Sequence, residues 1–485
     1  MKKYTLIVSM ALLCIFSATA QNDIDAMRYS QLTFGGTARF ASMAGSMGAL
    51  GGDISTLSFN PAGIAIFKKT ELSITPSIFS QTTSSTYNGM NSSNSKLNFN
   101  LGNIGVVATF DVDQKKNPGG WVSGNFGFGY NRTNNFHNNV SIVGDNKKSS
   151  LLDTYVADAN GHDYTQFDQF STGLAWQAWL INPVDTSGSL IYNHVIPNYG
   201  EKQKKSSTTT GSMGETVISF GGNYKNKVFV GGTLGIVHEG YHEKTTYEEI
   251  DEKDTIANFK SFKFTQDLTT RGSGVNFKFG VIVKPTDWLR IGAAIHTPTS
   301  LSLKDTYTNH MSSDLDGGVH YDTVSPQGSY DYRLTTPFRA IGSIGFIVKK
   351  IALLNVDYEY VNYSTAQLHS MPTEEDVFTD VNTAIRAKYT ATGNIRAGAE
   401  IRFDPFAFRF GYALYGSPFK EGENKNASRS SYTAGIGYRQ NNYFLDFAYV
   451  LTKYKEFNYL YDSAPTSVEN KYKNSSFMLT MGVRF

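Results

Sequence analysis

The C-terminal end of the chain alternates between apolar and other side chains. Between residues 477 and 485 every second residue is apolar, and Thr480, Gly482 and Arg484 lie among the intervening positions. A period of two is that of a β-strand, and such a strand can lie between lipid and a polar lumen. An edge strand of a soluble sandwich has the same period, so the interpretation depends on whether the pattern recurs.

The pattern recurs along most of the chain. Residues 289–296, 354–360, 395–403, 406–414 and 443–451 each have an aromatic or aliphatic face and a small or charged face. In a transmembrane barrel the charged face lies in the lumen. We therefore predict an all-β fold, a closed antiparallel transmembrane β-barrel of about fourteen strands over residues 66–485. The predicted strand centres are Ile74, Ile104, Phe126, Ile218, Leu234, Phe277, Ile291, Ile341, Val356, Ile401, Phe410, Ile436, Phe447 and Met481.

The connections between these strands are of two lengths. Residues 285–287, 404–405 and 440–441 predict tight turns. Short turns on the periplasmic rim and long loops on the outer rim are typical of outer-membrane barrels. The stretch 261–284 is long enough to contain a bend or bulge. Long polar connections are predicted at residues 81–96, 137–211, 362–393 and 416–429.

Residues 21–65, before the first strand, do not follow the strand pattern. Gly45, Gly48 and Gly51 recur at every third position, and small residues permit the close packing that a plug inside a barrel needs. A flexible leader is the alternative, but Met47 and Leu50 are apolar side chains that a free leader does not need. We predict that residues 21–65 form a hatch inside the barrel.

A second exception lies within the longest connection. Six apolar residues there are spaced mainly three and four apart, which predicts an amphipathic helix. The helix either packs on its own loop or exposes an apolar surface that captures a hydrophobic ligand, and the two interpretations are compatible. The residues of this capture site are Phe167, Phe170, Leu174, Trp176, Trp179 and Leu180.

The composition fits an exported barrel. Lys2 and Lys3, an apolar run and the Ala18-Thr19-Ala20 pattern predict a signal peptide over residues 1–20. Its removal removes Cys14, the only cysteine, and leaves no disulfide framework. The 44 basic and 42 acidic residues give no indication of nucleic-acid binding, and no second apolar run is long enough for a membrane helix.

Candidate chemistry is sparse. No nucleotide-binding loop, serine-hydrolase elbow or zinc-protease motif is present, and His238 with His242 is too loose a spacing to predict a metal site. We expect no metal and no cofactor. A mixed-sign, hydrogen-bonded lumen is the simplest interpretation of a set of charged residues, namely Asp357, Glu359, Glu400 and Asp446 with Arg290, Arg396, Arg402 and Arg439.

The N-terminal region carries a family resemblance. Residues 37–45 and 48–53, and above all the Asn-Pro-Ala-Gly element at residues 60–63, resemble the plug of the FadL/TodX outer-membrane transporters. Residues 289–299 and 408–418 are similar to later barrel strands of that family. The resemblance implies a fourteen-stranded barrel closed by a hatch whose residues include Arg39, Phe40, Met43, Met47, Leu50, Asp53, Asn60, Pro61, Ala62 and Gly63.

The resemblance also implies a route for the solute. The solute would be captured at outer loops, pass the hatch as it moves, and leave sideways through a kinked third strand. Asn125, Phe126 and Gly127 lie in that strand, where nearby glycines permit a kink. We expect a monomer in the Gram-negative outer membrane whose partners are a hydrophobic small molecule, membrane lipids and the barrel-assembly machinery.

The predicted function is passive transport of hydrophobic small molecules, either similar to long-chain fatty acids or aromatic. No energy source is visible in the sequence. The alternatives are an outer-membrane enzyme, with a catalytic group near the outer rim, and an adhesin or structural barrel. Haem uptake is a ligand variant that the histidine spacing does not support.

Overall fold

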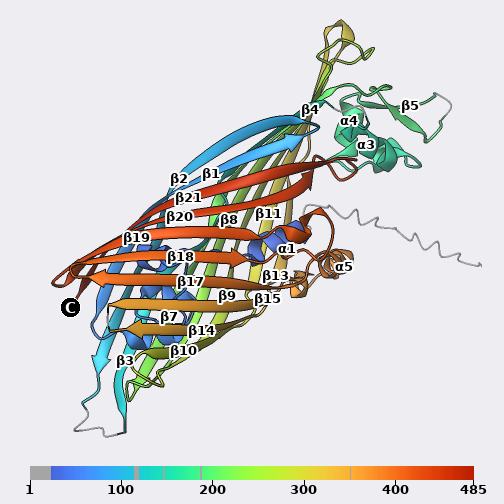
Figure 1. Ribbon diagram of the computed structural model, residues 1–485. Helices are drawn as coiled ribbons and strands as arrows, with labels where there is room; N and C mark the ends of the chain where they lie inside the picture. The colour runs from blue at the N-terminus through green and yellow to red at the C-terminus, as the bar shows by residue number, and fades with distance from the viewer. Residues whose placement is uncertain (1–22, 114–118, 146–147, 186–187, 350) are drawn as a thin grey trace, which may run out of the picture.

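The computed structural model describes residues 23–113, 119–145, 148–185, 188–349 and 351–485. The predicted signal peptide lies outside them. Within them, fourteen antiparallel strands form a closed wall around a helical N-terminal segment, and a small helical lobe extends from one end (Figure 1). The wall strands are β1 (Glu71–Tyr87), β2 (Met90–Asp111), β3 (Trp121–Asn135), β7 (Lys202–Tyr224), β8 (Val228–Ile250), β9 (Ser261–Val283), β10 (Leu289–His296), β14 (Arg339–Val348), β15 (Ala352–Asn362), β17 (Ala391–Phe403), β18 (Phe406–Tyr415), β19 (Arg429–Gln440), β20 (Tyr443–Tyr459) and β21 (Ser467–Arg484).

The barrel closes by pairing of its first and last strands. β1 pairs with β21 from Glu71 opposite Arg484 to Thr86 opposite Glu469, so the first and last strands complete each other's backbone hydrogen bonds, as a barrel in lipid requires. Each of the fourteen predicted strand centres lies in a different wall strand. The predicted barrel of about fourteen strands is therefore confirmed.

Shorter strands extend the wall towards the loops. β11 and β13 continue the positions of β10 and β14, β4 pairs with β7, and β16 pairs with β13. The bounds are β4 (Asn138–Asp145), β11 (Ser300–Leu315), β12 (Val319–Val324), β13 (Gly328–Thr335) and β16 (Gln367–Ser370), with the separate pair β5 (Ile181–Pro183) and β6 (Tyr192–His194).

Helices lie at the N-terminus and in the connections. In the N-terminal segment they are α1 (Asp23–Ser30), α2 (Ala38–Ser42), η1 (Ile54–Ser58) and η2 (Pro61–Ile66). In the connections they are α3 (Leu151–Ala159), η3 (Tyr164–Gln166), α4 (Thr172–Gln177), η4 (Asp316–Gly318), η5 (Tyr363–Thr365), α5 (Thr379–Lys388) and η6 (Glu423–Asn426). None of the helices in the described part of the chain is long and apolar enough to span a membrane.

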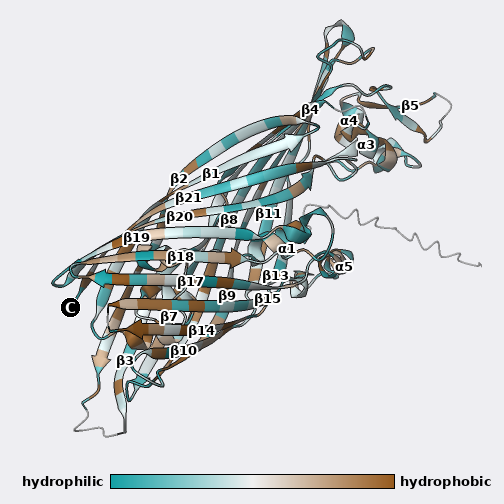
Figure 2. Ribbon diagram, viewed as in Figure 1, coloured by the Kyte–Doolittle hydropathy of each residue, from teal (hydrophilic) through white to brown (hydrophobic). Residues whose placement is uncertain are grey.

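The wall is apolar outside and polar inside. Along β15, Leu354, Val356 and Tyr358 are 44–51% exposed, whereas Asn355 and Asp357 are buried. Figure 2 shows brown, apolar residues recurring along β10, β14 and β15, and mostly white and teal residues at the ends of β1 and β2 nearest β4. Such a surface is stable only where lipid covers it, because water would be in contact with a continuous apolar band.

Two expectations about connections were wrong. Residues 81–96 do not form a long loop, because β1 and β2 continue to a tight turn at Asn88 and Gly89, whose φ angles are +47° and +81°. An Asn-Gly pair tolerates positive φ and so favours a two-residue hairpin. The predicted connection 137–211 is shorter than expected, because β4 begins at Asn138 and β7 at Lys202. The long stretch 261–284 is the single strand β9, whose register changes by one residue between its partners β10 and β11.

The helix predicted from the stripe at residues 167–180 is shorter than expected. Asp168 accepts hydrogen bonds from the Phe170 amide and the Ser171 hydroxyl in a turn before the helix, and α4 extends only from Thr172 to Gln177. The spacing was therefore that of a folded loop with one short helix, which brings the same apolar residues together.

Candidate transport pathway

The N-terminal segment, residues 23–66, lies inside the barrel and is called the hatch below. Asp23 at its start accepts a hydrogen bond from the Tyr389 hydroxyl (2.9 Å) and pairs with Lys388 (2.6 Å) beside α5, at the end of the barrel with long connections. Its end is near the rim with short turns. Hatch backbone and hydroxyl groups form hydrogen bonds with wall residues of β21, β19, β15, β8 and β10, namely Thr480, Thr433, Asn355, Thr233 and His296. The hatch therefore crosses the lumen.

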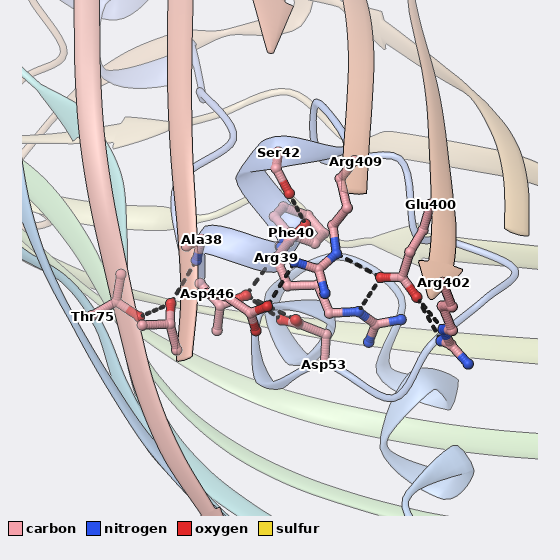
Figure 3. A network of polar contacts seen from close by, with 12 residues as sticks. Ala38, Arg39, Phe40, Ser42, Asp53, Thr75, Glu400, Arg402, Arg409 and Asp446 are labelled. Carbon is pink, nitrogen blue, oxygen red and sulfur yellow. Dashed lines mark hydrogen bonds and ion pairs between the residues drawn. The ribbon is translucent and has the colours of Figure 1, made fainter. Parts of the chain in front are cut away.

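One ionic network connects the hatch to the wall (Figure 3). The Glu400 carboxylate on β17 accepts hydrogen bonds from Arg39 of the hatch (2.9 Å), Arg402 (2.6 Å) and Arg409 (2.6 Å). Arg409 also donates to Asp446 on β20 at 2.6 Å. Glu400 and Arg409 are fully buried, and a buried charge is tolerated only when its partners remain in place.

The Asn-Pro-Ala-Gly element has a clear structural role. The Asn60 side-chain oxygen accepts a hydrogen bond from the Ala62 amide (3.1 Å) and so caps η2, while its nitrogen donates to the Gly48 carbonyl (2.6 Å). Pro61 follows at the first helical position, where a missing N–H has no cost. A Cβ on Gly63 would lie 2.4 Å from a hydroxyl oxygen of the preceding turn. The element fixes the fold of the hatch.

The other predicted hatch residues form its apolar and polar interior. Asp53 accepts hydrogen bonds from the Ser55 amide (2.9 Å) and the Thr37 hydroxyl (2.8 Å), which holds two hatch turns together. Phe40, Met43, Met47 and Leu50 are buried in one cluster with Ala294, Ile341 and Leu353 of the wall. The hatch thus packs on the wall through apolar as well as ionic contacts.

A cavity of about 170 Å³ lies between hatch residues 31–35 and the wall. It extends towards the outer loops, where Pro418 and Ala427 contribute to its lining. The apolar part of the lining includes Leu32, Phe34, Phe79, Val450 and Met478, and the polar part includes Arg132, Arg429, Asn134 and Asn394. The space is amphipathic, with aromatic and aliphatic side chains next to two arginines.

β3 is irregular where it borders this cavity. Its register with β7 shifts between Arg132 and Asn134, and the Thr133 carbonyl accepts a hydrogen bond from the Thr33 amide of the hatch (2.9 Å). Among the described residues, pairing between β2 and β3 ends at Asn103 opposite Asn131. Beyond that point side chains connect the two strands, for example the Arg132 Nε donating to the Leu101 carbonyl at 3.2 Å.

A family model for outer membrane transport proteins, OMPP1/FadL/TodX, matches residues 15–485. The chain belongs to this family. It is therefore an outer-membrane protein of a transport family, and the resemblance drawn from the hatch motif is confirmed. No curated relative matches the sequence.

Solved structures of the family share the fold. A Pseudomonas aeruginosa FadL homologue superposes with a TM-score of 0.57 at 12% identity, covering 94% of this chain and 100% of that one. The toluene transporter TodX of P. putida gives 0.54 at 11% identity, covering 93% and 99%. CymD, a monoaromatic hydrocarbon channel, gives 0.50 at 11% identity, covering 93% and 98%.

Residues 125–127, where a kink was predicted, lie in a regular part of the barrel wall. Pairing of β3 with β2 and β7 continues without a shift through these residues. Asn125 donates to the Thr109 hydroxyl (2.8 Å), and the Phe126 ring lies 5.1 Å from that of Phe220. The register of β3 with β7 shifts on either side of these residues, between Trp121 and Ser123 and between Arg132 and Asn134. The glycines near residue 127 accommodate the hatch, since a Cβ on Gly127 would contact Leu57 and Ile64.

The predicted capture residues gather in the outer lobe. Phe167, Leu174 and Leu180 are buried in a cluster with residues of α3, β9 and β11, so the segment packs on neighbouring strands as well as on its own loop. Trp179 is 54% exposed and its ring stacks on Tyr321, while Trp176 stacks on Tyr164. Phe170 lies against the ring of Tyr307 at 4.9 Å.

Three of the predicted lumen carboxylates, Glu359, Glu400 and Asp446, pair with arginines. Glu359 is bonded to Arg396 (3.0 Å), as the mixed-sign lumen predicts, and also to Arg339 (2.7 Å). Asp446 pairs with Arg409 and not with Arg439. Arg409 was available to sequence reasoning, because it lies on the charged face of the 406–414 alternation. Cross-strand partners depend on register, which the alternation does not determine.

The paired histidines of β8 do not form a ligand set. His242 bonds to Asp267 at 2.9 Å, and the described residues contain no group of three or more histidine, cysteine or acidic side chains placed to hold a metal ion.

Proposed function

We propose that this protein carries hydrophobic or amphipathic small molecules across the outer membrane by passive diffusion, under control of the hatch. The observation that carries the proposal is the position of the amphipathic cavity. It has hatch residues on one side and the interrupted β2–β3 seam on the other. A solute in this cavity would be next to both the barrier and a gap in the wall.

The lining of the cavity favours a solute with an apolar body and a polar end. Leu32, Phe34 and Met478 offer apolar contacts, and Arg132 and Arg429 offer hydrogen-bond donors. Burial of a ligand's apolar surface contributes roughly 25 cal/mol per Å², and a polar end would be oriented by the arginines. Both fatty acid-like and aromatic solutes meet this description.

The seam between β2 and β3 supports lateral exit. Gly102, Arg132 and Asn134 line the cavity and also border the unpaired stretch. The contacts that bridge it are side-chain hydrogen bonds, such as Asn135 to Asn98 at 3.3 Å. Side-chain contacts can open without breaking a backbone ladder, so this stretch is a better exit than the regular pairing at residues 125–127.

Trp179 is the best remaining candidate for capture on the outer lobe. Its ring is exposed beside Tyr321, whereas Phe167, Leu174 and Leu180 are buried. We therefore narrow the capture surface to the aromatic residues Trp179, Tyr321, Trp176 and Tyr164.

The structure offers little support for an outer-membrane enzyme. The Asp153–His194 pair (2.9 Å) lies in the outer lobe, and its geometry resembles part of a catalytic triad. The other ring nitrogen of His194, however, accepts the Ile196 amide hydrogen bond at 3.2 Å. No ring nitrogen is therefore left to activate a nucleophile.

Flux through the reconstituted protein tests the transport proposal. Liposomes containing the protein and an internal fatty acid-binding reporter should take up laurate and toluene faster than empty liposomes, while glucose entry should be unchanged. Equal uptake of laurate and toluene with and without the protein would contradict the proposal. Rapid entry of glucose would show an open water pore. Mass spectrometry of gently purified protein would then identify the bound native solute.

A further inference from the structure

A second cavity, of about 880 Å³, lies at the rim with short turns. Its lining includes hatch residues 50–52 and Ile66, the residues 67–69 that follow the hatch, and turn residues such as Lys284 and Lys349. Since short turns face the periplasm, this cavity is the periplasmic mouth of the barrel. The hatch lies between it and the cavity that borders the β2–β3 seam.

The mouth is strongly basic. Nine lysine and arginine residues line it, against two carboxylates, Glu71 and Asp287. Those carboxylates pair with Arg484 (2.7 Å) and Lys284 (2.6 Å). Arg39 and Arg402 share Glu400 behind the cavity wall. The five other cations of the mouth form no ion pair with a carboxylate of the described residues, namely Lys68, Lys69, Arg290, Lys349 and Arg439.

Two of these cations have unused hydrogen-bond donors. The Nε and Nη2 atoms of Arg439 are buried and have no partner in the described residues. In Arg290, Nη1 donates to the Leu50 carbonyl of the hatch at 2.5 Å, while Nε is buried without a partner. A buried donor without an acceptor destabilises the protein, and an oxyanion in the mouth would satisfy these groups.

One side of the same mouth is apolar. Ile66 and Phe67 at the end of the hatch meet Trp288, Ile347 and Leu353 of the wall around this space. Trp288 is 55% exposed and its ring stacks on Phe346. Cations beside an apolar surface complement a molecule that has an oxyanion head and a hydrocarbon tail.

We propose that the periplasmic mouth is a binding site for a single-chain amphipathic anion, with Arg439 and Arg290 holding the oxyanion head and Trp288 contacting the tail. A single-chain molecule is favoured over a bilayer lipid, because Arg290, Arg402 and Arg439 belong to wall strands and the end of the hatch closes the space behind them. The site is separated by the hatch from the cavity on which the transport proposal rests, so either proposal can fail without the other.

Fluorescence quenching of Trp288 tests the site. The full protein in phosphatidylcholine nanodiscs is titrated with 11-bromoundecanoate and, as the uncharged matched probe, 11-bromoundecanol. The Trp288→Phe variant gives the signal of the other tryptophans, which is subtracted. We expect saturable quenching by the carboxylate and about tenfold weaker binding in Arg439→Gln, because a charge-assisted hydrogen bond is lost.

Surface variants keep the test independent of folding. The Lys68→Gln/Lys69→Gln/Lys349→Gln variant removes three exposed cations of the mouth and should also weaken carboxylate binding. Lys473→Gln, an exposed cation on β21 beyond the mouth, is the matched control and should bind as the parent does. Equal quenching by acid and alcohol, or equal weakening by Lys473→Gln, would overturn the site. Displacement of the probe by phosphatidylglycerol in the nanodisc would overturn the assignment to a single-chain anion.

Discussion

Neither the hatch nor the outer lobe follows the alternating pattern of the wall strands, yet the two regions are stabilised in different ways. The lobe has its own apolar cluster, in which Leu152, Leu174 and Leu180 pack among residues of the strand tips. The apolar residues of the hatch belong to several smaller clusters that also contain wall residues, and the Glu400 network connects the hatch to the wall. The lobe therefore rests on strand tips at one end of the barrel, whereas the hatch contacts the wall along the lumen through several apolar clusters and one buried ionic network.

The largest loss of stability should come from breaking the Glu400 network. Glu400→Gln removes the one charge that Arg39, Arg402 and Arg409 share, and leaves the buried Arg39 guanidinium without a carboxylate partner, while Arg409 keeps Asp446. Loss of one partner in a buried ionic group costs about 3–5 kcal/mol. We expect a lower midpoint of guanidinium unfolding in detergent and higher leakage of small hydrophilic solutes into liposomes.

Arg402→Gln is the matched control, because its side chain is partly exposed and Glu400 keeps two arginines. Arg402→Gln should change the unfolding midpoint and the leakage much less than Glu400→Gln does. Unchanged leakage and stability in Glu400→Gln would show that the network does not hold the hatch.

The second effect should be confined to the outer lobe. Leu152→Ala removes a fully buried side chain from the lobe cluster, and such truncations cost about 2–5 kcal/mol. Hydrogen exchange should increase in residues 151–196 while the wall strands stay protected. Leu190→Ala, at a position 42% exposed, serves as the control. Loss of protection in the hatch as well would show that the two regions are coupled.

A smaller effect should follow from removing the cap of η2. Asn60→Ala loses the hydrogen bonds to Ala62 and Gly48, and loss of an N-cap costs about 1 kcal/mol. Hydrogen exchange in the hatch should become faster, and laurate flux should rise. Asn60→Asp keeps the capping oxygen and should retain more of the parent's protection. Identical exchange in all three proteins would remove the element from the account of hatch stability.

The smallest effect on stability should be that of Trp179→Ala. The side chain is on the surface, so the change in unfolding free energy should stay within about 0.5 kcal/mol. Toluene uptake at low concentration should nevertheless slow if the aromatic surface captures solute. Uptake equal to that of the parent at every concentration would exclude Trp179 from capture.

The wall was more predictable from sequence than the loops. The alternation of apolar and polar residues predicted the wall strands, because in a barrel strand every second side chain faces lipid and is apolar. Phe406, Phe408 and Phe410 are exposed on that face. The alternation could not show that β1 and β2 extend to a turn at Asn88, since those strand ends leave the lipid and lose their apolar face. Partner choice in the lumen and the position of the β3 irregularity depend on register and on Thr33 of the hatch, which no local pattern encodes.

Cross-linking the β2–β3 seam tests whether solute leaves the barrel between these two strands. The mature chain has no cysteine if cleavage follows residue 20, so Asn98→Cys/Asn135→Cys can join the two side chains that now share a hydrogen bond. Ser84→Cys/Ser93→Cys joins opposite residues of the continuous β1–β2 hairpin as the control. We expect that oxidation of the first pair stops laurate and toluene flux, that reduction restores it, and that the control pair has no effect. Full flux through the oxidised Asn98–Asn135 variant would contradict it.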